Sequence, residues 1–213
     1  MDEGVLEWQP YVVDLAEEHV VGSPGGLAYV RSIQKFSPAD YIVYRPGAVY
    51  RDGDSGKTLG QEAIFIATAT LRQPGDPATV MVNRSEKEVR PGDRLMPAGR
   101  EEIGSGYAPH SPKSGMAGRI ISVMDGVTQI GQFSVVALDR GRLDGVERGH
   151  VLEIWQKGES IRDTVNSRFD EILIGPEQKA GVLMVFQIFD RVSFALVMKA
   201  ERFIHVLDLV KSP

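Results

Sequence analysis

Short apolar runs rich in β-branched and aromatic residues recur along the whole chain and constrain its fold more than any other feature. Typical runs are residues 41–44, 79–82 and 151–155, and clusters of glycine, proline and aspartate separate such runs at intervals of about 10 residues. This rhythm is typical of strands in a barrel or sandwich, not of helices alternating with strands. Only residues 12–19 suggest a helical turn, and weakly. The sequence therefore predicts an all-β fold.

The chain has 213 residues, which is enough for one large domain or two small ones. Near its middle lies a stretch crowded with glycine, proline and serine that has no apolar periodicity. We interpret residues 98–118 as a linker or long loop. This division predicts an N-terminal β lobe over residues 1–97 and a C-terminal β lobe over residues 119–213.

The two halves resemble each other in the order of their motifs. Three pairs of charged residues share one offset of 115 positions: Arg84 and Lys199, Glu86 and Glu201, and Asp93 and Asp208. Arg51-Asp52 and Arg162-Asp163 likewise precede a loop in each half. We interpret the pattern as an internal duplication that gives two similar small β-barrel-like lobes, with chance similarity between β-rich segments as the alternative.

Composition excludes several classes of function. The net charge of −5 and the pI of about 5.4 argue against a nucleic-acid partner, because proteins that neutralise phosphates usually have a basic excess. The chain has no cysteine, and no apolar run approaches the roughly 18 residues that cross a bilayer, so we expect no membrane span. No signal peptide is visible at the N-terminus, so the chain is either cytoplasmic as it stands or a fragment of an exported protein.

Residues 53–58, Gly-Asp-Ser-Gly-Lys-Thr, resemble two catalytic motifs by chance. A phosphate-binding loop needs a glycine five residues before Gly56, where this chain has Arg51, and the following residues predict a strand instead of a helix. A serine protease would need a histidine base for Ser55, and only His19 lies upstream. We therefore predict a solvated hairpin turn.

The remaining polar candidates also favour structural roles. The four histidines (His19, His110, His150 and His205) never fall at the sequence spacing of metal ligands. Asp139, Asp144 and Glu147 cluster in a segment that we interpret as a strand, a turn and a returning strand, with turn-forming aspartates and surface charge. We expect no catalytic, cofactor-binding or metal-binding residues, no cofactor and no enzyme activity.

Exposed aromatic side chains are the remaining route to a binding function. Tyr44, Tyr50, Trp155 and Phe189 are candidates to stack on sugar or to anchor a partner, although strand alternation turns about half of such residues inward. Residues 89–95, Val-Arg-Pro-Gly-Asp-Arg-Leu, predict a turn followed by a closing strand. The sequence does not identify which residues contact a partner.

The order of motifs over most of the chain resembles the C-terminal region of a known family. The matching segments are residues 10–13, 25–31, 41–52, 56–69, 89–97, 118–155 and 180–208, of which residues 125–132 and the run LDRG…DGVERGHVL are the most specific. This family comprises the lysin-motif proteins associated with type IV pilus secretins. Its C-terminal region is similar to the small β-barrel at the C-terminus of a flagellar basal-body assembly protein.

The resemblance implies a non-enzymatic periplasmic anchoring module that associates with an outer-membrane secretin. The family binds peptidoglycan through an N-terminal lysin motif, and neither that motif nor the export signal occurs in these 213 residues. Several copies could bind a secretin ring at once and transmit the load of pilus retraction to the cell wall. The alternatives are a flagellar ring-stabilising protein and a peptidoglycan-binding or peptidoglycan-modifying protein.

Overall fold

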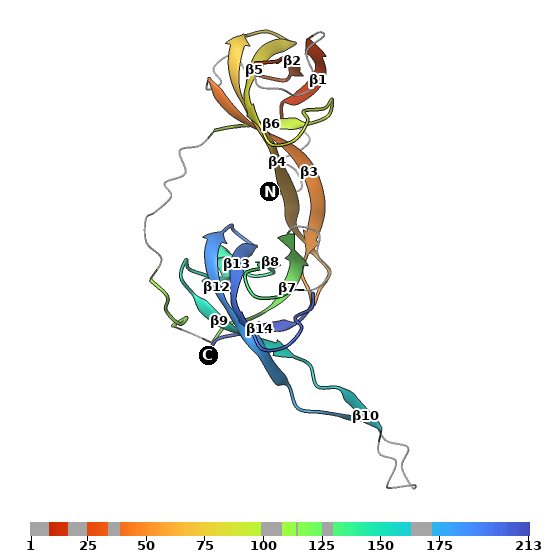
Figure 1. Cartoon of the computed structure of the whole chain (residues 1–213), viewed down its shortest axis with the longest axis vertical. Coiled ribbons are helices and arrows are strands. Elements are labelled where there is room, and N and C mark those ends of the chain that lie inside the picture. Colours follow the sequence, from red (N-terminus) through yellow and green to blue (C-terminus); the bar gives the residue numbers. More distant parts are fainter. Residues whose placement is uncertain are drawn as a thin grey trace. The chain divides into compact units, whose positions relative to one another are not determined.

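A computed structural model describes residues 9–16, 25–33, 39–98, 108–113, 115–124, 130–162 and 172–213. Two closed β-barrels and a separate two-stranded sheet make up the fold, so the predicted all-β class is confirmed (Figure 1). The chain divides into two compact units: Met1–Val49 with Gly60–Ile103, and Tyr50–Leu59 with Gly104–Pro213. In the part of the chain that the structure describes, no helix is long and apolar enough to span a bilayer.

The first barrel consists of six antiparallel strands in the order β1-β2-β5-β4-β3-β6. Their bounds are β1 Tyr11–Ala16, β2 Leu27–Arg31, β3 Asp40–Arg51, β4 Thr58–Gln73, β5 Ala78–Ser85 and β6 Arg94–Pro97. Alternate side chains of β5 (Ala78, Val80 and Val82) are buried, as the period of two in a strand requires. They pack in a core with apolar residues of the other strands, including Val30, Val43, Ile66 and Leu95.

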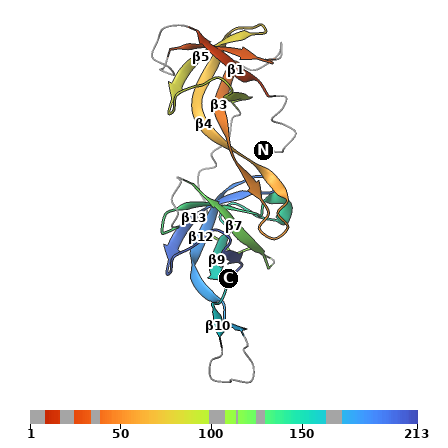
Figure 2. The ribbon, with the colours of Figure 1, turned by 90° about the vertical axis from the view of Figure 1, so that its right-hand side faces the viewer.

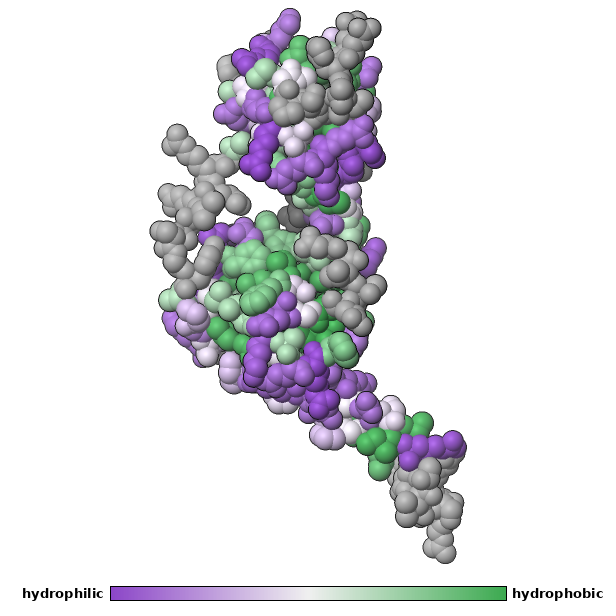
Figure 3. Space-filling model, viewed as in Figure 1, coloured by the Kyte–Doolittle hydropathy of each residue, from purple (hydrophilic) through white to green (hydrophobic). Residues whose placement is uncertain are grey.

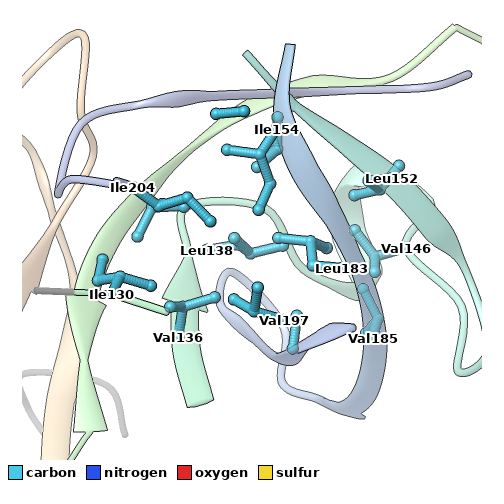
Figure 4. Packing of buried hydrophobic residues seen from close by; sticks show 14 residues of the cluster. Ile130, Val136, Leu138, Val146, Leu152, Ile154, Leu183, Val185, Val197 and Ile204 are labelled. Carbon is cyan, nitrogen blue, oxygen red and sulfur yellow. The ribbon is translucent and has the colours of Figure 1, made fainter. Parts of the chain in front are cut away.

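The second barrel also has six strands, in the order β12-β13-β8-β7-β14-β9. Their bounds are β7 Ala117–Val123, β8 Val135–Leu138, β9 Val151–Gln156, β12 Gln178–Ile188, β13 Ser193–Ala200 and β14 Leu209–Lys211. A 3-10 turn, η2 (Arg142–Asp144), lies between β8 and β9. The core residues Leu138, Ile154, Leu183 and Val197 converge on the barrel interior (Figure 4).

The two barrels have the same topology. Because each barrel is closed, its strand order can start anywhere, and from its first strand in sequence each follows the order first, second, fifth, fourth, third, sixth. The fifth strands, β5 and β13, also have identical patterns of buried and exposed residues. Equal topology is what an internal duplication would produce, but the common origin of the lobes stays a prediction.

Equivalent hydrogen bonds recur at the sequence offset of 115. The Asp93 carboxylate accepts the backbone N–H of Arg90 at 2.8 Å, and the Asp208 carboxylate accepts that of His205 at 2.9 Å. Arg84 pairs with Glu86 at 3.0 Å, as Lys199 does with Glu201 at 2.7 Å. In each barrel the aspartate therefore closes the turn that leads into the last strand.

The turn predicted for residues 89–95 is followed by the predicted closing strand. Gly92 has a φ of 90°, which favours glycine, and β6 pairs with both β1 and β3 to close the first barrel. Buried Asp93 accepts two hydrogen bonds from the Arg45 guanidinium, at 2.7 and 2.9 Å. These two charge-assisted hydrogen bonds replace the hydrogen bonds to water that the carboxylate loses on burial.

Three details of the chain differ from the sequence analysis. The helical turn suggested for residues 12–19 is wrong over residues 12–16, which belong to strand β1; residues 17–19 lie outside the described residues. Residues 50–59 belong to the second unit and not to the N-terminal lobe. Within the predicted linker, His110 forms a parallel bridge with His150, so this part of the segment is tied to the second unit.

Candidate functional site

A two-stranded antiparallel ribbon extends the β9–β12 hairpin beyond the second barrel. The ribbon consists of β10 (Ser160–Arg162) and β11 (Ile172–Ile174), and we call it the arm. Both Figure 1 and Figure 2 show it projecting from the end of β9 and β12. In the described part of the chain β10 and β11 pair only with each other, so each strand has an open edge.

The arm exposes large aliphatic side chains on both of its faces. The exposed fractions are 53% for Ile161, 47% for Leu173, 67% for Ile172 and 63% for Ile174. Ile161 lies opposite Leu173, so these two share one face, while Ile172 and Ile174 point to the other. They form a green cluster at the arm in Figure 3.

This concentration of exposed aliphatic surface is unfavourable in water. A two-stranded ribbon without a core is marginally stable on its own, and contiguous exposed apolar residues typically mark interaction sites. Burying one such side chain against a partner would contribute about 1.5–3 kcal/mol. The arm therefore has the chemistry of a protein-docking element.

Close backbone packing of two glycines forms the base of the arm. A Cβ at Gly158 would lie 1.7 Å from the carbonyl oxygen of Gly175, which excludes any other residue in this conformation. The Gly175 N–H donates to the Glu159 carbonyl at 2.9 Å. These contacts fix the direction in which the arm leaves the barrel.

The segment Gly-Asp-Ser-Gly-Lys-Thr is a hairpin turn between β3 and β4, as predicted. Asp52 accepts hydrogen bonds from the Ser55 N–H at 2.6 Å, the Ser55 hydroxyl at 2.7 Å and the Asp54 N–H at 3.2 Å. These bonds, with the Ser55 hydroxyl first, lower the pKa of Asp52 to about 2. The Ser55 hydroxyl thus donates to a carboxylate, and none of the histidines that the structure describes is bonded to it.

Polar contacts hold the tip of this hairpin within the second unit. The Gly53 N–H donates to Asp139 at 3.1 Å, Arg119 pairs with Asp54 at 2.7 Å and Arg140 pairs with Asp52 at 3.3 Å. The tip also has an apolar side, because Tyr50 is buried and packs edge-to-face on Phe194 with ring centroids 6.2 Å apart. The prediction of a merely solvated turn missed this packing.

The assignment of Asp139 to a turn or to surface charge was wrong. Asp139 is a buried structural residue. Its side chain is 0% exposed and accepts the Arg119 N–H at 2.7 Å, in addition to the Gly53 N–H. Asp144 does act in the turn as predicted, because its carboxylate accepts the Gly141 N–H at 2.9 Å.

The structure brings His110, Glu147 and His150 together, although the histidines do not fall at the sequence spacing of metal ligands. One potential ligand atom from each lies within 4.8 Å of the other two. The imidazole ring centroids of His110 and His150 are 4.9 Å apart, and His110 Nε2 lies 3.7 Å from a Glu147 carboxylate oxygen. These residues could hold a metal ion.

The other histidines have no such neighbours among the described residues. His205 is exposed, and its Nδ1 is 4.0 Å from the Asp208 carboxylate. His19 lies outside the described residues. A structural role for His205 agrees with the prediction.

Two of the four aromatic candidates for partner contact were wrong. Tyr44 and Tyr50 are buried, so they belong to the interior. Trp155 is half-buried; its indole N–H donates to Glu153, and the Lys211 ammonium lies 5.7 Å from the ring centroid. Phe189 is exposed, but it packs edge-to-face on Phe194 at 5.7 Å.

No protein-family model matches this chain, and no curated protein matches it.

The arm was not anticipated from the sequence, which predicts only a loop between Asp163 and Gly181. The aliphatic triplet Ile172-Leu173-Ile174 stands inside that stretch and is a strand signal. It is too short to be distinguished from a small core strand by pattern alone. Whether its side chains are exposed or buried is decided by the tertiary structure, which places the triplet outside the barrel.

Proposed function

We propose that this chain is a non-enzymatic binding and anchoring module that docks on an outer-membrane secretin through the arm. The observation that carries the proposal is the exposure of Ile161, Ile172, Leu173 and Ile174 on the ribbon. The family resemblance supplies the identity of the partner. We further propose that the module acts in the periplasm and that a lysin motif missing from this chain links it to peptidoglycan.

The arm offers two means of binding a folded partner. Its open strand edges can accept a further strand through backbone hydrogen bonds, and its aliphatic side chains can enter apolar pockets. Backbone pairing supplies affinity, while alternate side chains supply specificity. We propose that a strand of the secretin pairs along the arm.

The closed barrels suit a load-bearing role. In each barrel all six strands are paired on both sides, so no barrel edge is available for peeling. A secretin is a symmetric ring, and several copies on one ring would gain attachment strength through effective concentration. The arm then needs only moderate affinity at each site.

Co-purification with the secretin of the same organism tests the proposal. We expect the intact chain to be retained and the variant Ile172→Asp/Ile174→Asp to be retained at least about tenfold less, because a charge in a docked apolar patch is desolvated without a partner. Leu143→Asp is the matched control, since Leu143 is 72% exposed in η2, away from the arm. Equal retention of all three proteins would refute docking through the arm.

A further inference from the structure

His110 and His150 approach each other because their backbones pair. The His110 N–H donates to the Gly149 carbonyl at 2.9 Å, and the Val151 N–H donates to the His110 carbonyl at 2.9 Å. Both residues belong to the second unit, although 40 positions of sequence separate them. Glu147 lies three residues before His150, at the start of the tight turn that the His150 N–H closes by donating to the Glu147 carbonyl at 3.2 Å. The three side chains therefore meet on backbone that is already hydrogen-bonded.

His110 is oriented as a metal ligand. Its Nδ1 lies 3.0 Å from the Ala108 carbonyl oxygen and so donates its proton there, which leaves the lone pair on Nε2. Histidine ligands typically have such a carbonyl partner on the other ring nitrogen. Nε2 lies 3.7 Å from the Glu147 carboxylate, near the roughly 3.4 Å that separates two ligands of a tetrahedral zinc ion.

His150 contributes a neutral imidazole. It is only 3% exposed. Its Nδ1 accepts a hydrogen bond from the Glu147 backbone N–H at 3.1 Å. Nδ1 therefore carries no proton, and its lone pair points toward the Glu147 backbone. A metal ion bound at Nδ1 would take the place of this backbone donor.

We propose that His110, Glu147 and His150 bind a divalent transition-metal ion, with zinc as the best fit. Two imidazoles and one carboxylate form a ligand set that zinc accepts in tetrahedral geometry, with water as the fourth ligand. Partial exposure of His110 and Glu147 gives the ion a route from solvent. The bound ion ties the segment around His110 to the turn before β9. This inference is independent of the proposed function.

Zinc titration of the untagged, chelator-treated full chain by isothermal calorimetry tests the site. We expect one zinc ion per chain and, with Co²⁺ as the probe, the visible absorption of a tetrahedral complex. His110→Ala and Glu147→Gln should each weaken binding by at least about 100-fold, because loss of even an outer partner costs 10–100-fold. Both residues are substantially exposed, so the variants should fold.

His205→Ala is the control, since it removes another exposed histidine beside a carboxylate. It should bind zinc with unchanged affinity. The proposal is overturned if the intact chain does not bind zinc, if His110→Ala binds as tightly as the intact chain, or if His205→Ala loses binding equally. Far-ultraviolet circular dichroism of each variant establishes that the barrels are intact.

Discussion

Asp139 connects the hairpin tip to the second barrel through its buried carboxylate. It satisfies the N–H groups of Gly53 and Arg119 and lies 3.3 Å from the Arg140 guanidinium. Removing the carboxylate would leave these two N–H donors without their acceptor, and Arg140 would keep only Asp52 as a carboxylate partner. Such losses in buried positions cost more than the hydrogen bonds themselves contribute.

Asp139→Ala should therefore lower the free energy of unfolding of the second unit by about 2–4 kcal/mol. Urea unfolding followed by fluorescence would measure the change. Asp190→Ala is the control, because the Asp190–Arg142 pair is exposed on both sides and should contribute less than about 1 kcal/mol. Equal effects of the two substitutions would contradict the role of Asp139.

The hairpin tip should also respond to acid through Asp52. Hydrogen bonds from Ser55 lower the Asp52 pKa from 3.8 to about 2 in the folded chain. The carboxylate therefore stabilises the fold above pH 3.8, and this contribution is lost as the pH falls toward 2. Asp52→Asn should be less stable than the intact chain at neutral pH, and the Tm difference should shrink over that window. A Tm difference that does not depend on pH would contradict this linkage.

At the scale of elements, the arm depends on the contact between Gly158 and Gly175. Gly158→Ala would place a methyl group against the Gly175 carbonyl and displace the base of the arm. Hydrogen exchange of the Gly175 amide should then become faster, while exchange of the core amide of Ile154 should not change. Gly115→Ala is the control, because nothing lies within 4 Å of its added Cβ. An unchanged exchange rate of the Gly175 amide would show that the contact between Gly158 and Gly175 does not hold the arm in place.

The barrel strands could be predicted from the sequence because local and tertiary preferences agree in them. In β5 (Ala78–Ser85) the apolar residues Ala78, Val80 and Val82 stand at alternate positions, and the face that they share is the buried face. The turn around Gly92 and the closing strand β6 were predictable for the same reason, because turn residues and strand pattern coincide.

The candidate sites could not be predicted in this way because they depend on long-range pairing. His110 and His150 meet only through a parallel bridge between distant segments. Tyr44 and Tyr50 carry the same β propensity whether they face inward or outward, so burial in the folded chain decides their role. Exposure of the arm likewise depends on where the barrel ends.

At the scale of the whole molecule, the second unit consists of two separate stretches of chain, Tyr50–Leu59 and Gly104–Pro213. A fragment comprising only residues 104–213 lacks the Gly53 donor to Asp139 and the Tyr50 ring on Phe194. It should have a lower Tm than the second unit of the intact chain. Calorimetry of both proteins would test this dependence, and equal Tm values would contradict it.

Photo-crosslinking from the arm in living cells tests the central claim most directly. A photoreactive amino acid at Ile172 should crosslink to the secretin, because Ile172 is 67% exposed on the proposed docking element. The same amino acid at Leu143, which is similarly exposed in η2, should not. We expect a secretin adduct at Ile172 alone; an adduct at Leu143 but not at Ile172, or at neither position, would rule out docking through the arm.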